Sequence, residues 1–320
     1  MNRVTVEFET ITPLFTGDTW GSCAELKPSS IMGSLRFWFE VYCHFAGIDV
    51  KEKEELKDID YQKILQNLKK DIDDIDKYIF DRLPLTLSSK IFGCTGWKSR
   101  IEIESIRYLD DYCFGNRLNL PSKIIPSKNW FFAKPYFFGK FQITFKTTEE
   151  IKSNILFPLL NFIQKYGFIG AKNNIGYGRI KVLNPEVSKL NIIKISKFLK
   201  ENKDIKEEIF KEKDLSQNLN GLDYSRIEIF KTDIHSNDLE SIIKKLISKK
   251  AELRRQENNK YIRHYKFGSI AKDIYKNEEH NIEIKGPNAT KIIPLIEKEN
   301  DKYIGKFLSI WGIQNFGDKR

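Results

Sequence analysis

Cysteines are few in this sequence, and no spacing groups them. Four cysteines are scattered through 320 residues without a Cys-x-x-Cys pair: Cys23, Cys43, Cys94 and Cys113. Neither a structural zinc site nor a disulfide framework has the spacing that it needs. We therefore expect buried free thiols, no metal and no cofactor.

Long apolar runs are also missing. No stretch is long enough to span a bilayer, and the N-terminal segment Met1–Phe15 alternates in polarity, whereas a signal peptide has a continuous apolar segment. The 40% hydrophobic and 13% aromatic residues suffice for a full core, and the length favours two domains. We expect a soluble, cytoplasmic protein with no membrane partner.

Acidic residues are nearly absent between Tyr112 and Pro185, which holds eleven bases and two acids, a net charge of +9. By contrast, Asp49–Asp81 holds seven bases and eleven acids, a net charge of −4. The formal charge of the chain, +10, is therefore concentrated. A solvated lysine face is the ordinary interpretation of such a run, and a polyanion-binding surface is the alternative.

A glycine-rich segment lies inside this basic region. Gly170, Gly176 and Gly178 alternate with basic and amide side chains and directly precede a strand-like pattern; those side chains are Lys172, Asn173, Asn174 and Arg179. Glycines let the backbone turn tightly and approach a phosphate, which the two cations and exposed amides can bind. A Walker loop is excluded because it runs from a strand into a helix. A simple helix-to-strand connection remains the alternative.

The first part of the chain has an alternating order of elements. The patterns predict, in order, a strand over 4–11, a helix from Ser29 or Ser30 to Gly47, strands over 101–106 and 137–145, a helix over 149–166 broken or kinked at Pro158, and a strand over 178–183. This is the ferredoxin-like order, with a charged helical insertion over about 49–81 and the glycine-rich loop at 167–178. One sheet face would be free for a ligand.

The rest of the chain predicts a linker and a second domain. Residues 188–222 are rich in charge and read as a helical linker. The second domain, 223–320, has a strand over 225–234, a helix over 238–258 and paired strands over 289–298 and 302–312. The predicted class is α+β: domain 1–187 and a second, degenerate unit, two ferredoxin-like (RRM-like) domains in tandem.

Other residues are candidates for phosphate contacts. Lys27, Ser29 and Ser30 stand at the start of the first helix, where free amides and hydroxyls suit an anion. Arg36 lies one turn further, although an ion pair with Glu40 is the alternative. Lys98 and Arg100 precede the strand over 101–106 and are predicted at the sheet edge that holds the glycine-rich loop. Trp97 would stack a base or cover the core.

Four motifs follow one another in the chain: ITPLFTGD (11–18), KPSSIMGSLRFWFE (27–40), IFGCTGWKSRIEI (91–103) and GFIGAKNNIGYGRI (167–180). In this order and spacing they resemble the RAMP superfamily of CRISPR-associated proteins, most specifically the first RAMP subunit of type III-B (Cmr) effectors. FGS (267–269) and GPNATKIIPLI resemble the family's second domain more weakly. The family usually has several arginines between the loop glycines; here Lys172, Asn173 and Asn174 stand there, so we expect weaker salt-dependent binding.

The resemblance implies two ferredoxin-like domains and a noncatalytic RNA-binding subunit of a ribonucleoprotein. Its partners would be guide RNA, other Cmr subunits and, as a further candidate, target RNA, held toward the 3′ end of the guide. The alternative is a metal-independent endoribonuclease that processes CRISPR RNA, for which the resemblance points to His44 as general base. Asp18 is similar in place to a loop aspartate with which some RAMP subunits cut target RNA. A helix-end histidine and a turn residue are the ordinary interpretations.

A third hypothesis is a scaffold in which the acidic insertion docks a basic partner and RNA contact is incidental.

Overall fold

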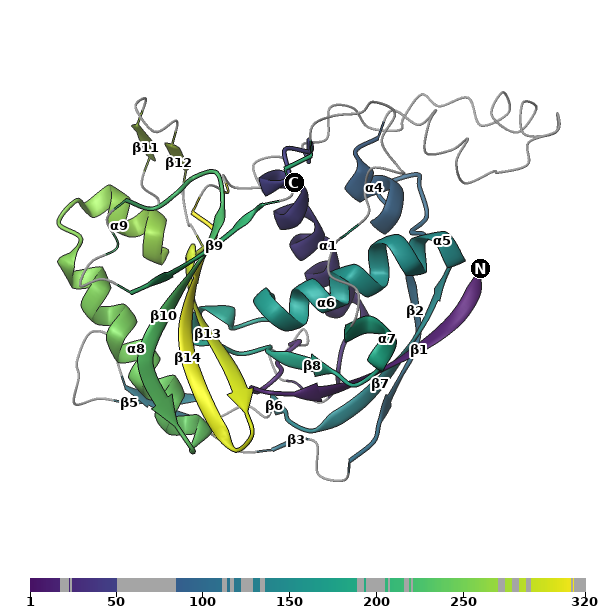
Figure 1. Ribbon diagram of the computed structural model, residues 1–320, viewed down its shortest axis with the longest axis horizontal. Helices are drawn as coiled ribbons and strands as arrows, with labels where there is room; N and C mark the ends of the chain where they lie inside the picture. The colour runs from purple at the N-terminus through teal and green to yellow at the C-terminus, as the bar shows by residue number, and fades with distance from the viewer. Residues whose placement is uncertain are drawn as a thin grey trace.

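Figure 1 shows the computed structural model of the chain, in which two sheets lie side by side with helices between and beside them. The described residues are 1–17, 23, 25–50, 85–110, 114–115, 118–121, 129–132, 136–188, 193, 205–206, 208–215, 219, 221–269, 274–277, 282–285, 289–311 and 313. Most of the predicted insertion at 49–81, Asp18 and Cys113 lie outside them.

The first sheet has four strands in the order β2-β7-β1-β8: β1 (Asn2–Thr10), β2 (Glu102–Tyr108), β7 (Lys140–Thr147) and β8 (Ile180–Val182). All neighbouring strands are antiparallel. The predicted strands of the first domain are therefore confirmed, with shifts of a few residues at their ends. Alternation explains β1, because Val6 and Phe8 are buried while Thr5 and Glu7 face outward.

The outward face of this sheet is polar and carries ion pairs. Arg3 donates two hydrogen bonds to the Glu104 carboxylate at 2.7 Å, and Lys146 pairs with the same group at 2.8 Å. These contacts lower the pKa of Glu104 to about 2, chiefly through the Arg3 hydrogen bond. The face predicted to be free for a ligand is thus occupied in part by carboxylates, which do not attract RNA phosphates.

Helices cover the opposite face. In Figure 1, α1 (Pro28–Phe45) and α6 (Phe157–Tyr166) lie over the first sheet and contact one another. Before α6 come α5 (Glu149–Ile151) and a π-helical turn, Lys152–Leu156, and the residues at both junctions have αR backbone angles, so the chain stays helical through Pro158. The predicted helix over 149–166 is confirmed; its irregularity is the π-helical turn directly before Pro158, and the chain does not break there. Two short helices, α4 (Leu87–Phe92) and α7 (Pro185–Ser188), complete this layer.

The second sheet has the order β13-β14-β10-β9: β9 (Phe210–Asp214), β10 (Ile227–Ser236), β13 (Ile292–Glu299) and β14 (Lys302–Ser309). The predicted pairing of the last two strands is confirmed. The helical linker predicted over 188–222 is wrong at β9, which pairs parallel with β10. As an edge strand of mostly charged residues, β9 lacks the apolar alternation by which sequence reasoning finds strands.

Helix α8 (Leu239–Gln256) covers one face of the second sheet and confirms the predicted helix, with Asp238 as its N-cap. A further helix, α9 (Lys260–Phe267), follows it. The remaining strands form three small pairs: β3 (Phe114–Gly115) with β6 (Tyr136–Phe137), β4 (Leu118–Pro121) with β5 (Asn129–Phe132), and β11 (Ile274–Asn277) with β12 (Ile282–Lys285). The β4 strand lies against α8, so a segment that precedes β7 in the chain reaches the helix that covers the second sheet.

The two sheets share a core. Ile229 and Leu308 of the second sheet are buried in the same cluster as Trp38 of α1 and Leu159 of α6. Across this boundary the rings of Tyr166 and Phe210 stack at 4.2 Å. The opposite face of the second sheet packs against α8 in a second cluster, which also takes in Ile175 and Tyr177 of the glycine-rich loop. The loop therefore touches both halves.

Candidate nucleic-acid interface

The candidate site is centred on the start of α1. Lys27 is the N-cap residue and forms no side-chain cap, Pro28 follows it, and the first turn contains no acidic residue. An 18-residue helix directs its positive end and the amides of its first turn toward this point. The helix start is therefore suited to an anion.

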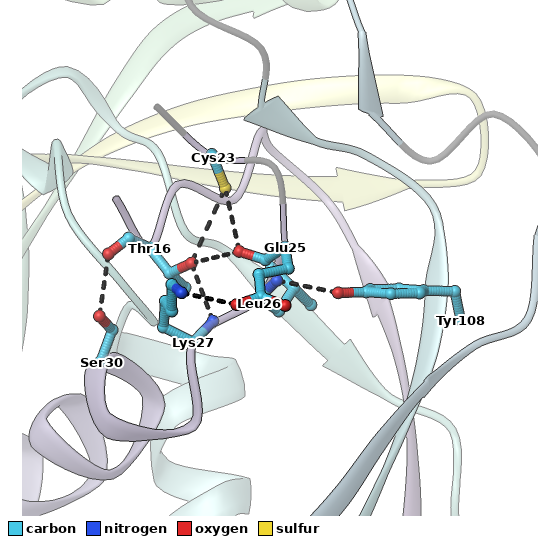
Figure 2. Close-up of polar contacts among 7 residues, drawn as sticks. All are labelled: Thr16, Cys23, Glu25, Leu26, Lys27, Ser30 and Tyr108. Carbon is cyan, nitrogen blue, oxygen red and sulfur yellow. Dashed lines mark hydrogen bonds and ion pairs between the residues drawn. The ribbon is translucent and has the colours of Figure 1, made fainter. Parts of the chain in front are cut away.

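Figure 2 shows how the neighbouring segments are tied to this helix start. The Ser30 hydroxyl donates to the Thr16 carbonyl at 2.8 Å, and the Lys27 amide donates to Thr16 Oγ1 at 3.1 Å. The Leu26 amide donates to the Tyr108 hydroxyl at 2.9 Å. Ser30 is thus a brace between loop and helix; the prediction that Ser29 or Ser30 caps the helix is wrong, since the cap position is Lys27.

The front of the glycine-rich loop reaches the same place. The Gly170 amide donates to Ser34 Oγ at 2.9 Å, one turn after Ser30 on α1, and the Ala171 amide donates to the Phe15 carbonyl at 2.7 Å. Lys172, in the left-handed region with φ 65°, places its ammonium 3.8 Å from the centroid of the Phe15 ring. Because Phe15 and Thr16 are adjacent, Lys172 and Lys27 lie on one small region, here called the α1 entrance (Thr16, Lys27, Ser29, Ser30, Lys172).

The glycines of the loop are required by close contacts with the protein's own backbone. Gly170 and Gly178 have φ values of 80° and 89°, and a Cβ at these positions would lie 2.5 Å from the Phe15 carbonyl oxygen and 2.1 Å from that of Ile169. Gly176, with φ 89°, faces Ile296 of β13. We predicted that these glycines let the backbone approach a phosphate. The structure instead explains them by close contact between chain segments.

Arg179 is not a phosphate ligand in this structure, which corrects the prediction. It is 1% exposed, and its guanidinium donates to five main-chain carbonyls. Four belong to the end of α6 and the residue after it, and the fifth is that of Ile296 at 3.1 Å. Burial lowers the pKa of Arg179 to about 10. Its charge caps the negative end of α6 and joins the two sheets.

Asn173 and Asn174 form a 3₁₀ turn, Asn173–Ile175, between these two halves of the loop. Asn174 is exposed, and its carbonyl accepts a hydrogen bond from the ammonium of Lys250 of α8 at 3.1 Å. Sequence reasoning missed Lys250, since nothing in the periodicity of α8 links it to a loop so distant in the chain.

Arg36 is also occupied within the protein, contrary to the prediction. It forms an ion pair with Glu40 at 2.8 Å and donates to the Gly93 carbonyl at 2.7 Å and to Ser89 Oγ at 3.0 Å. These contacts hold α4 against α1. The alternative of an i, i+4 pair is therefore the observed one.

Lys98 and Arg100 lie at the opposite corner of the first sheet from the loop, so the prediction of a shared edge is wrong. They precede β2, and β2 and β8 are the two edge strands. Ile180 at the start of β8 pairs with Thr10 at the end of β1, whereas Glu102 at the start of β2 pairs with Lys146, which pairs with Arg3. Lys98 pairs with Glu102 at 2.8 Å, and Arg100 lies 4.8 Å from the Trp97 ring.

His44 stands in the last turn of α1, its ring edge-on to Phe45 at 5.1 Å. The helix rise of 1.5 Å per residue places it about 25 Å from Lys27. The described residues contain no group of three or more His, Cys, Asp or Glu that is placed to hold a metal ion. Of the described helices, none combines the length and apolar character that crossing a bilayer would require.

The fold and this entrance define an α+β protein with two four-stranded sheets and a basic helix start. The chain belongs to the RAMP superfamily, whose family model matches residues 7–181. Comparison with curated proteins found no match.

Solved structures with a similar fold include Cmr1 from Pyrococcus furiosus in its apo form, at 14% identity and a TM-score of 0.43, covering 97% of this chain and 88% of that one. A chain of the type III-B Cmr-beta complex bound to cognate target RNA and AMPPnP is similar at 10% identity and a TM-score of 0.49, covering 95% and 94%. Cmr6 from Pyrococcus furiosus is similar at 16% identity and a TM-score of 0.31, covering 56% and 97%.

Proposed function

We propose that this RAMP protein is a noncatalytic RNA-binding subunit of a cytoplasmic type III-B CRISPR (Cmr) ribonucleoprotein. It would hold guide RNA, with target RNA as a further candidate, toward the guide 3′ end, beside other Cmr subunits. Membership of the RAMP superfamily supports the proposal.

The observation that carries the proposal is the convergence of two cations on the α1 entrance. Lys27 and Lys172 come from distant parts of the chain and meet at a helix start with no acidic residue in its first turn: the Lys27 amide bonds to Thr16, and the Lys172 ammonium lies over the adjacent Phe15 ring. The Lys27 ammonium pairs with the exposed Glu25 carboxylate at 2.5 Å (Figure 2), so a phosphate there would compete with that carboxylate. Helix amides and ammonium groups bind phosphate without reading bases, so sequence preference should be weak.

We also propose that both sheets are ferredoxin-like domains. The first is supported by its chain order and by the antiparallel sheet β2-β7-β1-β8, in which each helix crossover passes one strand. The second departs from it through the parallel pair of β9 and β10, which fits a degenerate unit.

The absence of catalysis is part of the proposal. His44 lies at the far end of α1 from the entrance, so a base there would act on RNA held elsewhere. The test for cleavage is therefore incubation with CRISPR repeat RNA in EDTA, where intact RNA is expected.

The binding test compares two double variants of the full chain on labelled single-stranded CRISPR RNA across a salt series. Lys27→Ala/Lys172→Ala should weaken binding about tenfold at low salt and reduce the slope of log affinity against log salt by about 1.4, since each lost phosphate contact removes about 0.7. The matched control Lys98→Ala/Lys181→Ala removes two exposed cations from other parts of the first sheet and should change little. If the two double variants lose the same amount of RNA affinity, the effect comes from net charge alone and contradicts a binding site at the α1 entrance.

A further inference from the structure

The segment from α8 through α9 carries more positive charge than its own acids balance. Residues 239–267 contain three acids, Glu240, Glu252 and Glu257, and nine bases: Lys244, Lys245, Lys249, Lys250, Arg254, Arg255, Lys260, Arg263 and Lys266. Figure 1 shows the two helices together at the outer side of the second sheet, away from α1.

All three acids are already paired with lysines. Glu240 pairs with Lys244 at 2.6 Å, and Glu252 pairs with Lys249 at 2.9 Å. Glu257 pairs with the buried Lys266 at 2.6 Å. The three carboxylates of the segment therefore pair with lysines, and none of them pairs with an arginine of the segment.

Three arginines remain without a carboxylate among the described residues. Arg254 donates to the carbonyls of Phe267 and Gly268, and Arg263 donates to the carbonyl of Glu257. Arg255 is exposed and forms no hydrogen bond or ion pair with a described residue. Burial and then the positive charge of Arg263 lower the pKa of Arg254. A bound anion would offset both effects.

An aromatic side chain accompanies these cations. Tyr261 is 38% exposed, and the ammonium of Lys260 lies 5.7 Å from its ring centroid. Exposed aromatics beside arginines and lysines bind single-stranded nucleic acid, because bases stack on the ring while cations bind the phosphates.

The helix also touches the glycine-rich loop. Lys250 of α8 bonds to the Asn174 carbonyl, and Arg254 lies one turn further along the same helix. We propose that the α8–α9 surface, formed by Arg254, Arg255, Lys260, Tyr261 and Arg263, is a second binding surface for the phosphodiester backbone of single-stranded RNA. It continues the path that begins at the α1 entrance and rests on the proposed RNA-binding function.

The test uses the full chain and labelled single-stranded CRISPR RNA. Arg255→Glu is the main variant because Arg255 is exposed and forms no hydrogen bond or ion pair with a described residue, and Lys302→Glu, at the exposed first residue of β14, is its charge-matched control. We expect Arg255→Glu to weaken binding about tenfold at low salt and to reduce the salt slope by about 0.7. Arg255→Lys should restore most of the affinity, and Lys302→Glu should leave it near the wild-type value.

The outcomes separate this inference from the proposed function. If Lys27→Ala/Lys172→Ala weakens binding while Arg255→Glu matches Lys302→Glu, the second surface is overturned and the first remains. If the wild-type chain fails to bind RNA at any salt, the proposed function fails with it. If Arg255→Glu leaves RNA binding intact but abolishes association with a partner subunit, the surface binds an acidic protein, which also overturns the inference.

Discussion

Lys172 and Arg179 belong to one glycine-rich segment and would be taken for equivalent cations, yet they have opposite surroundings. Lys172 is partly exposed beside the start of α1, with its ammonium over the Phe15 ring. Arg179 is 1% exposed and binds five carbonyls at the joint of the two sheets. The front of the segment is partly exposed, and the back is buried and stabilises the protein.

The largest expected loss of stability follows a change at Arg179, at the back of the glycine-rich segment. Arg179→Met should destabilise the chain by about 4 kcal/mol, because five carbonyls lose a charged donor in a buried place. Urea unfolding measures the loss. The control Lys181→Ala, exposed on β8, should change stability by less than about 0.5 kcal/mol. A small loss for Arg179→Met would mean that water replaces the guanidinium.

Gly178→Ala should cause the next largest loss of stability, about 3 kcal/mol in the free energy of unfolding. Its φ is 89°, and the new Cβ would lie 2.1 Å from the Ile169 carbonyl oxygen, so the backbone must move. Gly33→Ala is the matched control, since nothing lies within 4 Å of that Cβ and Gly33 is an exposed residue of α1. Thermal unfolding should show Gly33→Ala stabilised by about 0.5–1 kcal/mol. Similar behaviour of the two variants would refute the close-approach argument.

Lys291, directly before β13, extends the comparison to a buried cation at the second sheet. Burial lowers its pKa from 10.5 to about 8, so between pH 8 and 10 the unfolded chain keeps a proton that the folded chain releases. Raising the pH through this interval therefore favours the folded state. Lys291→Met removes this titration, so only the wild type gains stability over this interval. The free energy of unfolding of Lys291→Met minus that of the wild type should therefore fall by roughly 2 kcal/mol between pH 7.5 and 10. An advantage that does not change with pH in urea titrations counts against this.

The smallest expected change in stability is at the front of the segment. Lys172→Ala removes a cation–π contact with Phe15 and should cost less than about 1 kcal/mol. RNA affinity should nevertheless fall about fivefold, from the loss of one phosphate contact. Lys172→Arg, which keeps the charge, should recover it. A stability loss as large as that of Arg179→Met would show that the two halves of the segment have the same role.

Sequence reasoning located most of the fold because its elements have strong periodicity. The strand alternation of β1 and β7 and the helical stripes of α1 and α8 arise from burying one face, so they can be read directly. It failed at β9, a charged edge strand, and at α9, which is short. Neither buries enough of one face to produce a pattern.

For the candidate site, sequence reasoning named Lys27, Ser29, Ser30 and Lys172, which the structure brings together. Sequence reasoning also named four cations that the structure places elsewhere. Arg36 and Arg179 bind carbonyls and a carboxylate of the protein itself. Lys98 and Arg100 stand at the opposite corner of the first sheet. A residue type signals that a cation is present and carries no information on its partners.

The sequence by itself determined the class of fold, the order of the strands and main helices of the first sheet, the RAMP motifs and the concentration of positive charge, because these depend on composition and local spacing. Only the tertiary structure decided which cations face outward. Burial and pairing depend on segments far apart in the chain, as when Ile296 of β13 accepts from Arg179, or when Asn174 accepts from Lys250 of α8. Desolvation and the supply of nearby acceptors separate a ligand-binding cation from a structural one, and both are set by packing.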